Sequence, residues 1–286
     1  MKIPSLFKNK KPIFSFEVFP PKRKANLDSI YETIEKLSVC KPDFISVTYG
    51  AGGNKVDDTT CQIAKNIKEK FNIEPVAHLT CVNSSMEDVQ NMIGRFAENN
   101  IENVLALRGD IIPGEIVKKD FSHANELAIE VQRKSDLQIL GACYPEGHCE
   151  SKNIREDIQN LKYKIGAGVK VLITQLFFDN QLFYNYLVQV RNAGIDIPIS
   201  AGIMPIVNKK QIEKTVALSG ASLPHEFTKM ISLYENDEQG LYEHGIQYAV
   251  DQITDLIEYG VDGIHLYTMN NPKVALEIYE KIKVLL

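Results

Sequence analysis

Several polar side chains stand where an apolar run of the sequence gives way to a loop, and Glu17 is the first of them. It lies in the segment Ser15-Phe-Glu-Val-Phe-Pro-Pro21, flanked by Phe16, Val18 and Phe19. A carboxyl group buried among apolar side chains is difficult to ionise, so its pKa should rise. A raised pKa is what a general acid that works near neutral pH requires. Glu17 is therefore a candidate proton donor, with a loop-pairing or helix-capping carboxylate as the alternative.

A second candidate position follows the apolar run Leu105-Ala-Leu107, where Arg108, Gly109 and Asp110 stand in succession. The guanidinium of Arg108 offers a planar fork of donors that suits a phosphate or a carbonyl-rich ring. The carboxylate of Asp110 can accept hydrogen bonds from ring N–H groups. The pair indicates a site for a polar ring system, with a plain ion pair between the two side chains as the alternative.

Further hydrogen-bonding side chains stand near the ends of other apolar runs. Thr48 and Tyr49 precede the glycine-rich stretch 50–53, and Gln175 follows another apolar run. The amide of Gln175 can both donate and accept hydrogen bonds. His78 lies among apolar neighbours, where a histidine buried for structural reasons is the more common case. Tight turns also use glycine, so these residues indicate a ligand only in combination.

An aromatic and basic group surrounds the next turn of the chain. Tyr144 and His148 follow an apolar run, and the helical segment after them carries Asp157, Asn160 and Lys164. If these side chains point the same way, they would suit a bulky aromatic cofactor that bears phosphate. Their spacing of three and seven residues is also that of one solvated helix face, which is the alternative.

The cysteines favour free thiols over a metal site. The five, Cys40, Cys61, Cys81, Cys143 and Cys149, form no CxxC pair. An odd number without an export signal is typical of a reducing cytoplasm. Cys143, His148 and Cys149 could be interpreted as zinc ligands, but no second cluster with zinc-finger spacing accompanies them. No metal is therefore expected.

Composition and charge argue against several classes of protein. Lys and Arg total 32 against 37 Asp and Glu, a net charge of −5, and the two signs are interspersed. A nucleic-acid-binding surface would need a basic stripe. No apolar run approaches the ~20 residues that span a bilayer, and the N-terminal segment lacks the apolar region of a secretory signal. We expect a cytoplasmic protein that binds neither nucleic acid nor membranes.

The elements that must position these side chains alternate regularly. Eight short runs rich in apolar residues are each followed by a segment of helical period. Several runs are apolar almost throughout, which is typical of parallel strands covered on both faces. The predicted strands span residues 13–19, 43–49, 75–80, 103–107, 138–144, 169–176, 197–203 and 263–267.

Strict alternation of strands and helices predicts parallel strands with right-handed crossovers. Eight such units close into a (β/α)8 TIM barrel, and no linker divides residues 1–286, so we expect one catalytic domain. Surplus length around residues 221–240 predicts an extra helix before strand eight. A doubly wound open sheet is the alternative, but it would favour a glycine-rich turn where Glu17-Val-Phe-Pro-Pro21 stands. In a barrel, the polar strand ends meet at the rim that carries active sites.

Eight motifs of the chain resemble those of the 5,10-methylenetetrahydrofolate reductases of the short bacterial type. They occur in the order of that family and cover essentially the whole chain. The motifs are Ser15-Phe-Glu-Val-Phe-Pro-Pro21, Ser46-Val-Thr-Tyr-Gly-Ala51, His78-Leu-Thr-Cys81, Leu105-Ala-Leu-Arg-Gly-Asp110, Tyr144-Pro-Glu146, Ile173-Thr-Gln-Leu-Phe-Phe-Asp179, Gly202-Ile-Met-Pro205 and His265-Leu-Tyr-Thr-Met-Asn270.

The resemblance implies a flavoprotein, with FAD rather than FMN, that takes hydride from NADH or NADPH and reduces 5,10-methylenetetrahydrofolate to 5-methyltetrahydrofolate. Glu17 matches the family's general acid, which protonates N10 of the folate before hydride arrives from flavin N5. Asp110 matches the residue that hydrogen-bonds the pterin beside the flavin. The implied contacts to folate and nicotinamide are Thr48, Gln175, Gln211 and Tyr267.

The resemblance also implies a set of flavin contacts, and three departures accompany it. The set comprises Tyr49, Ala51, His78, Arg108, Gly109, Asp110, Ala124, Tyr144, His148, Asp157, Asn160 and Lys164. Asn271 stands where relatives often have Arg, Thr215 replaces an aromatic residue, and His123 stands where relatives often have Tyr. The first two departures bear on substrate affinity rather than on the reaction.

The family further implies a homo-oligomer, and some relatives receive electrons from a partner subunit. Two alternatives belong to other classes of protein. One is a flavin-free barrel that binds a pterin and transfers a group, which would have no use for Arg108 and Lys164. The other is a non-catalytic folate-binding subunit, against which the retention of Glu17 beside Asp110 argues.

Overall fold

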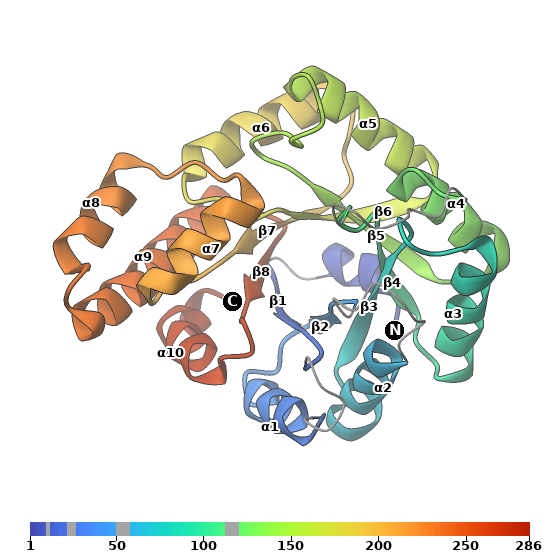
Figure 1. Ribbon diagram of the computed structural model, residues 1–286, viewed down its shortest axis with the longest axis horizontal. Helices are drawn as coiled ribbons and strands as arrows, with labels where there is room; N and C mark the ends of the chain where they lie inside the picture. Colours follow the sequence, from blue (N-terminus) through green and yellow to red (C-terminus); the bar gives the residue numbers. More distant parts are fainter. Residues whose placement is uncertain (10–11, 22–26, 50–57, 112–119) are drawn as a thin grey trace.

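Eight parallel strands close into a barrel in chain order, with the helices on its outside (Figure 1). The computed structural model describes residues 1–9, 12–21, 27–49, 58–111 and 120–286. The predicted (β/α)8 barrel is confirmed, and so is the extra helix before strand eight. The doubly wound open sheet is wrong, because β1 and β8 pair and leave no open edge.

The strands are shorter than the helices that connect them. They are β1 (Ile13–Val18), β2 (Phe44–Val47), β3 (Glu74–Thr80), β4 (Asn103–Leu107), β5 (Gln138–Cys143), β6 (Val169–Thr174), β7 (Ile199–Ile203) and β8 (Gly263–Tyr267). The α-helices are α1 (Leu27–Ser38), α2 (Thr59–Phe71), α3 (Met86–Glu98), α4 (Ala124–Lys134), α5 (Ile154–Gly166), α6 (Asn180–Asn192), α7 (Lys209–Ser219), α8 (His225–Tyr234), α9 (Glu238–Tyr259) and α10 (Pro272–Ile282). The helix before strand eight that the surplus length predicted is α8.

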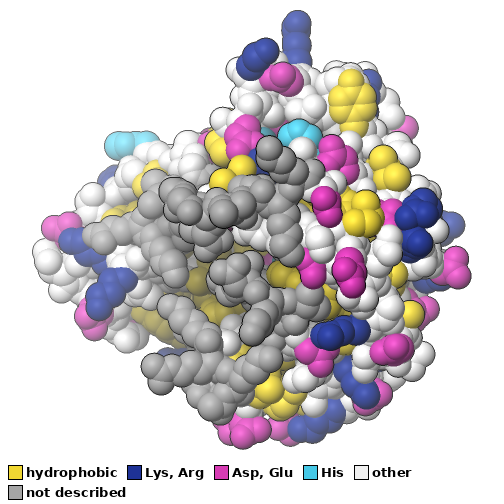
Figure 2. All heavy atoms as spheres, turned by 45° about the vertical axis from the view of Figure 1, so that its right-hand side comes forward, with side chains coloured by type: hydrophobic (Ala, Val, Ile, Leu, Met, Phe, Trp, Pro, Cys, Tyr) yellow, Lys and Arg dark blue, Asp and Glu magenta, His cyan; other side chains and the backbone are white. Residues whose placement is uncertain are grey.

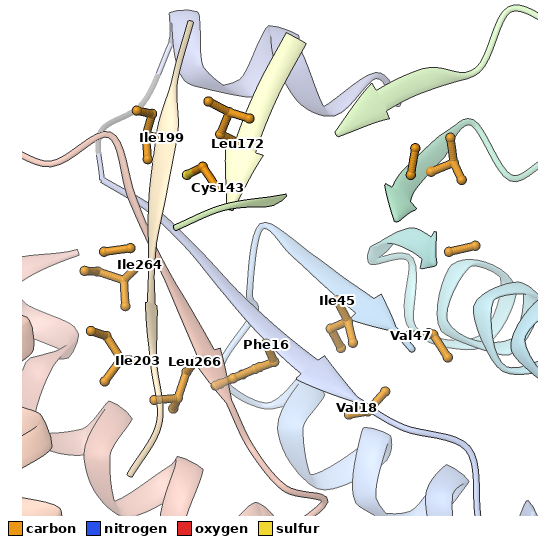
Figure 3. Packing of buried hydrophobic residues seen from close by; sticks show 14 of the residues in the cluster. Phe16, Val18, Ile45, Val47, Cys143, Leu172, Ile199, Ile203, Ile264 and Leu266 are labelled. Atoms are coloured by element: carbon orange, nitrogen blue, oxygen red, sulfur yellow. The ribbon is translucent and has the colours of Figure 1, made fainter. Parts of the chain in front are cut away.

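The main hydrophobic core lies between the strands and the surrounding helices. Phe16 on β1, Ile45 on β2 and Leu266 on β8 belong to it and are fully buried (Figure 3). Helix α3 shows how the sequence supplies the outer half of this core. Its capping box begins at Ser85, and its buried residues recur at intervals of three and four, so one apolar stripe faces the strands.

The N-terminal end of the barrel is closed by apolar side chains. The short 3-10 helix η1 (Ile3–Lys8) contributes Ile3 and Phe7, which pack with Ile13, Phe44 and Val76 inside the barrel. The opposite end, where the strands terminate, is the mouth of the barrel.

The outer surface carries charges of both signs. On the face drawn in Figure 2, acidic and basic side chains are interspersed, as the sequence suggested. The helices seen in the described ranges are each too short or too polar to traverse a bilayer.

Gly245 allows α9 to touch the loop after β7. A Cβ atom at this position would lie 1.9 Å from the carbonyl oxygen of Ile206, far inside van der Waals contact. We expect Gly245→Ala to lower the free energy of unfolding by about 3 kcal/mol, because backbone must shift to make room. Urea unfolding followed by circular dichroism measures the change.

Gly94 provides the matched control for this prediction. It lies inside α3, and a Cβ atom there would meet nothing within 4 Å. Gly94→Ala should leave stability unchanged or raise it by about 0.5–1 kcal/mol, since alanine is the better helix former. If both substitutions destabilise the protein equally, the close contact at Gly245 is not the cause.

Candidate active site

Glu17 lies at the mouth of the barrel with its side chain 19% exposed. Its neighbours in the register of the sheet are Ser46 on β2 and Tyr267 on β8. The Oε2 atom of Glu17 lies 3.4 Å from Ser46 Oγ, 3.4 Å from His78 Nε2 and 3.7 Å from His265 Nε2. Strands β1, β2, β3 and β8 therefore bring side chains to one carboxyl group.

The pKa of Glu17 lies below its ordinary value, so the rise expected from the sequence is wrong for this structure. Burial, the largest single influence, raises the pKa, but interactions with His265, with His78 and with a serine hydroxyl outweigh it. The expectation failed because successive residues of a strand face opposite sides. Phe16 and Val18 pack toward the helices, whereas the carboxyl group points at imidazole and hydroxyl groups inside the barrel.

The turn after β8 holds the backbone of the candidate acid. The hydroxyl of Thr268 donates to the carbonyl of Glu17 at 2.6 Å. Asn270 accepts a hydrogen bond from the amide of Phe19 at 3.0 Å and donates one to its carbonyl at 2.8 Å. Met269 and Asn270 have φ angles of 50° and 53°, a left-handed conformation that Asn adopts more readily than most residues. This turn therefore fixes where β1 delivers its carboxyl group.

His78 is buried and also faces Glu17. His78 is 5% exposed, and its Nε2 atom has no hydrogen-bond partner among the described residues. The contact with Glu17 at 3.4 Å is electrostatic rather than a hydrogen bond of good geometry. Burial lowers the pKa of His78 to about 4, with Glu17 acting in the opposite direction. The imidazole is therefore neutral at neutral pH and presents an unused polar atom.

Acid should destabilise the protein through this buried histidine. The folded state holds the pKa of His78 near 4, against 6.5 for an unperturbed histidine. The unfolded chain therefore takes up the proton first as the pH falls below 6.5, and the free energy of unfolding should fall by about 2 kcal/mol between pH 7 and pH 5. His78→Gln should remove this part of the loss. Urea unfolding at both pH values tests it, and an identical pH dependence in the two proteins would contradict it.

A second group of side chains, which we call the β5 cluster, lies around the loop after β5. It comprises Arg108, Tyr144, His148, Asp157 and Lys164. The ammonium group of Lys164 donates to the carbonyl of Ala142 at 3.0 Å and lies 5.5 Å from the ring of Tyr144. The rings of Tyr144 and His148 meet edge to face at 4.7 Å. Aromatic faces and two cationic groups are thus presented together.

Two alternatives to a ligand site were an ion pair at Arg108 and Asp110 and a solvated face of α5. Arg108 does form an ion pair, as the alternative expected, but its partner is Glu150 rather than Asp110, which is exposed. Asp157 is buried and burial lowers the pKa of Lys164, so these two side chains do not form a solvated helix face. Asn160, on the same helix, is exposed.

Tyr267 crosses the mouth from β8 toward β6. Its hydroxyl donates to the carbonyl of Thr174 at 2.6 Å. It passes over Gly202, where a Cβ atom would lie 2.4 Å from that carbonyl oxygen and 2.6 Å from the tyrosine hydroxyl. The glycine of the motif Gly202-Ile-Met-Pro205 is needed for this close approach. The ring lies near both Glu17 and Tyr144, whose charges help to raise the pKa of Tyr267 after burial.

The other predicted contact residues stand at the ends of their elements. Thr48 and Tyr49 follow β2, Gly109 follows β4 with a φ angle of 88°, and Ala124 begins α4. Ala51 lies outside the described residues.

The two predicted glutamine contacts are bonded to the backbone. The amide oxygen of Gln175 accepts from the backbone amide of Leu176 at 3.0 Å. Gln211, at the start of α7, bonds to Val207 and Pro205 in the loop after β7, at 3.1 Å each. Both would have to release these bonds to present the same atoms to a substrate.

The three residues that depart from the family pattern lie on helices or cap them. Asn271 caps α10 by accepting a bond from the amide of Val274 at 3.4 Å. Thr215 is buried on α7, and His123 occupies the N-cap position of α4.

Sequence reasoning missed three residues of the Glu17 site: Ser15, Ser46 and His265. All three are 0% exposed, and they lie inside the barrel on three different strands. The available signal was the alternation of β1, β2 and β8, in which these residues share the inward parity of Glu17 and Tyr267. Their contact could not be found without knowing that β1 pairs with β8.

Cysteine and cavity positions do not indicate a different site. Burial raises the pKa of the Cys143 thiol to about 12, whereas Cys149 is exposed. Among the residues that the structure describes, no group of three or more His, Cys, Asp or Glu side chains is arranged to hold a metal ion. Hollows of about 500 and 440 Å³ lie beside α6 and α9, away from Glu17. The ionisable groups around Glu17, rather than these two hollows, therefore indicate the site.

Comparison with known proteins decides the family. The family model described as methylenetetrahydrofolate reductase matches residues 2–283. The chain belongs to the methylenetetrahydrofolate reductase family. It is therefore an oxidoreductase of one-carbon folate metabolism, and membership supports reduction of methylenetetrahydrofolate to methyltetrahydrofolate.

Curated members of the methylenetetrahydrofolate reductase family resemble the chain over most of its length. The chain is 36% identical over 264 residues to the 5,10-methylenetetrahydrofolate reductase of Pectobacterium carotovorum, covering 92% of this chain and 88% of that protein. It is 34% identical to the Escherichia coli enzyme over the same fractions. The Arabidopsis thaliana methylenetetrahydrofolate reductase (NADH) 1 is 32% identical over 97% of this chain and 49% of its own length.

A solved structure supports the fold alone. An uncharacterised protein from Clostridium thermocellum, described as binding two copies of 5-methyl-5,6,7,8-tetrahydrofolic acid, aligns over 100% of both chains with a TM-score of 0.68. Its sequence identity is 14%, which is too low to transfer a binding site.

Proposed function

We propose that this chain reduces 5,10-methylenetetrahydrofolate to 5-methyltetrahydrofolate with a bound flavin, FAD rather than FMN, and with NADH or NADPH as electron donor. One observation carries the proposal: Glu17 lies partly buried at the mouth of the barrel, in contact with Ser46 and His78. A protonatable carboxyl group at that point is what ring opening of a methylene-folate needs.

The residues of the mouth fit a flavin. His78 has a buried Nε2 atom without a hydrogen-bond partner among the described residues, which a ring carbonyl or ring N–H could satisfy. Arg108 and Lys164 supply positive charge for phosphate, and Tyr144 supplies an aromatic face. When bound, the flavin would supply the hydride, while the protein supplies orientation and electrostatics. Tyr49, Ala51, Gly109, Ala124, His148, Asp157 and Asn160 complete the proposed set of contacts.

Glu17 would act as the general acid that donates a proton to N10 of the folate. Its pKa is low in the structure without substrate because imidazole and hydroxyl groups favour the carboxylate. A bound pterin would displace water from the mouth and bury the side chain further, which raises the pKa of a carboxyl group. Protonation of Glu17 and binding of the substrate would then be coupled, so the carboxyl group would hold its proton when the folate is bound.

Asp110 would orient the pterin and stabilise positive charge. The side chain is exposed at the mouth, so it is accessible to a ligand. A carboxylate can accept hydrogen bonds from the pterin ring, and its charge would favour the cation that forms when the ring opens.

Thr48, Gln175, Gln211 and Tyr267 are the proposed contacts to folate and nicotinamide. A cytoplasmic location, a single domain over residues 1–286, homo-oligomeric assembly and electron delivery by a partner subunit stay predictions.

The visible spectrum of the purified protein tests the proposal. A flavin should give absorption bands in the blue, and anaerobic NADH or NADPH should bleach them, because hydride transfer reduces the ring. Methylenetetrahydrofolate should then restore the colour. A colourless protein that takes up neither FAD nor FMN would instead favour a flavin-free transferase or a folate-binding subunit.

A further inference from the structure

A buried chain of polar side chains runs from Glu17 into the barrel. Ser15 and His265 are neighbours in the register of β1 and β8, and Glu17 and Ser46 are neighbours in that of β1 and β2. Ser15, Ser46 and His265 are 0% exposed. TIM-barrel interiors are filled mainly by branched apolar residues. Burying polar groups at three adjoining inward positions costs free energy unless they bond to one another. Ser15 and Ser46 both contact His265.

The hydrogen bond that Ser15 donates decides the tautomer of His265. The Ser15 hydroxyl lies 3.2 Å from the carbonyl of Ile264 and 2.7 Å from His265 Nδ1, and it has one proton to give. When that proton bonds to the carbonyl, the serine oxygen accepts from Nδ1, and Nε2 is the acceptor of the neutral imidazole.

The second nitrogen of His265 faces the candidate acid. Nε2 lies 3.3 Å from Ser46 Oγ and 3.7 Å from Glu17 Oε2, and Ser46 Oγ lies 3.4 Å from the same carboxyl oxygen. The single hydroxyl proton of Ser46 cannot bond to both groups. One additional proton therefore has two placements, on Glu17 beside a neutral imidazole or on Nε2 beside a carboxylate.

We propose that His265 is a positioning residue for Glu17 and stores, through Ser46, the proton that Glu17 donates to the substrate. This inference rests on the proposed function and deepens it. When substrate covers the mouth, the ion pair loses water and the uncharged pair becomes favoured. The Nε2–H bond breaks, its proton passes to Ser46 Oγ, and the hydroxyl proton of Ser46 passes to the carboxylate. Glu17 then gives its proton to N10, and a proton from solvent restores the imidazolium after release.

The other titratable groups near Glu17 do not provide the same path. His78 faces the carboxyl group from β3 at 3.4 Å but makes no hydrogen bond through Nε2 with any described residue. Tyr267, on β8, donates its hydroxyl to the carbonyl of Thr174. Cys143 and Tyr144, on β5 and just after it, act on Tyr267 rather than on Glu17.

The pH dependence of the folate half-reaction tests the proposal. Reduced holoenzyme is mixed with methylenetetrahydrofolate in an anaerobic stopped-flow instrument from pH 6 to pH 9, and reoxidation of the flavin is followed. In His265→Asn, which keeps a donor for Ser15 but cannot store a proton, the rate should fall by at least about tenfold. The alkaline limb of its pH–rate profile should move to lower pH by about one unit, because Glu17 then lacks the proton held by His265. Reduction by NADH in each protein serves as the internal reference.

Further variants make the result decisive. Ser46→Ala retains the imidazole but breaks the path, so it should slow the reaction while its alkaline limb stays near the wild-type pH. His265→Gln replaces His265→Asn if that variant does not fold. Ser200→Ala is the matched control, because Ser200 is buried on β7 with a hydroxyl that has no hydrogen-bond partner among the described residues. It should keep the wild-type profile.

The outcomes separate the two proposals. An alkaline limb that stays at the wild-type pH in the His265 variant overturns the role of His265, even if the reaction is slow. A wild-type holoenzyme that does not reduce the folate at any pH refutes the proposed function instead.

Discussion

Glu17→Gln is expected to slow reduction of the folate by about 10³-fold while the flavin is still reduced by NADH, since general acids contribute about 10² to 10⁴ in rate. The amide that replaces the carboxyl group would keep the shape of the side chain but could not release a proton. Nothing in the nicotinamide half-reaction requires that proton. Anaerobic stopped-flow measurement of the two half-reactions separates these effects.

Glu32→Gln is the matched control for the loss of the carboxyl group. Glu32 is exposed on the outer helix α1, and both half-reactions should proceed at the wild-type rate. Equal loss of both half-reactions in Glu17→Gln would show that the residue supports flavin binding or folding rather than proton transfer.

Asp110→Asn should reduce turnover of the folate by about 10- to 100-fold, because a hydrogen bond to a charged group is worth about 1.5–3 kcal/mol. The substitution keeps one acceptor oxygen but removes the charge that would stabilise a cationic intermediate. The effect should appear in kcat/KM for the folate and as a change in the flavin reduction potential. Steady-state kinetics and redox titration measure the two quantities.

Asp196→Asn provides the comparison for Asp110. Asp196 is exposed in the loop before β7, at the N-terminal end of the barrel. It should leave both quantities unchanged. If Asp110→Asn also leaves the folate kinetics unchanged, the assignment of Asp110 to the pterin is wrong.

The strands could be predicted from the sequence because each is a short run rich in apolar residues that is followed by a segment of helical period. Most differences are of one or two residues at either end, for example at the start of β7, which begins at Ile199 rather than at residue 197. The predicted runs 43–49, 138–144 and 169–176 end in the structure at Val47, Cys143 and Thr174. Backbone hydrogen bonds between neighbouring chain segments continue a little beyond those points, since the amide of Gln175 donates to the carbonyl of Cys143 at 2.7 Å and that of Thr48 to the carbonyl of Val18 at 3.0 Å.

The environment of Glu17 could not be predicted in the same way. Its sequence neighbours Phe16 and Val18 suggested an apolar pocket and a raised pKa, but they lie on the other face of β1. The groups that determine its ionisation, Ser46 and His265, are 29 and 248 positions away in the chain and meet it only when the barrel closes. A local pattern reports which side of a strand is buried, but not which side chains share the interior.

The apolar plug at the N-terminal end of the barrel has a consequence for proton exchange at His265. Phe44, which packs with Ile3 and Phe7, also stacks on the imidazole of His265 at 5.7 Å and covers it from below. In the proposed mechanism, protons would therefore exchange with His265 from the side of the mouth, where the folate would also bind. A bound product would then delay reprotonation of the imidazole, so product release would come before the acid is restored.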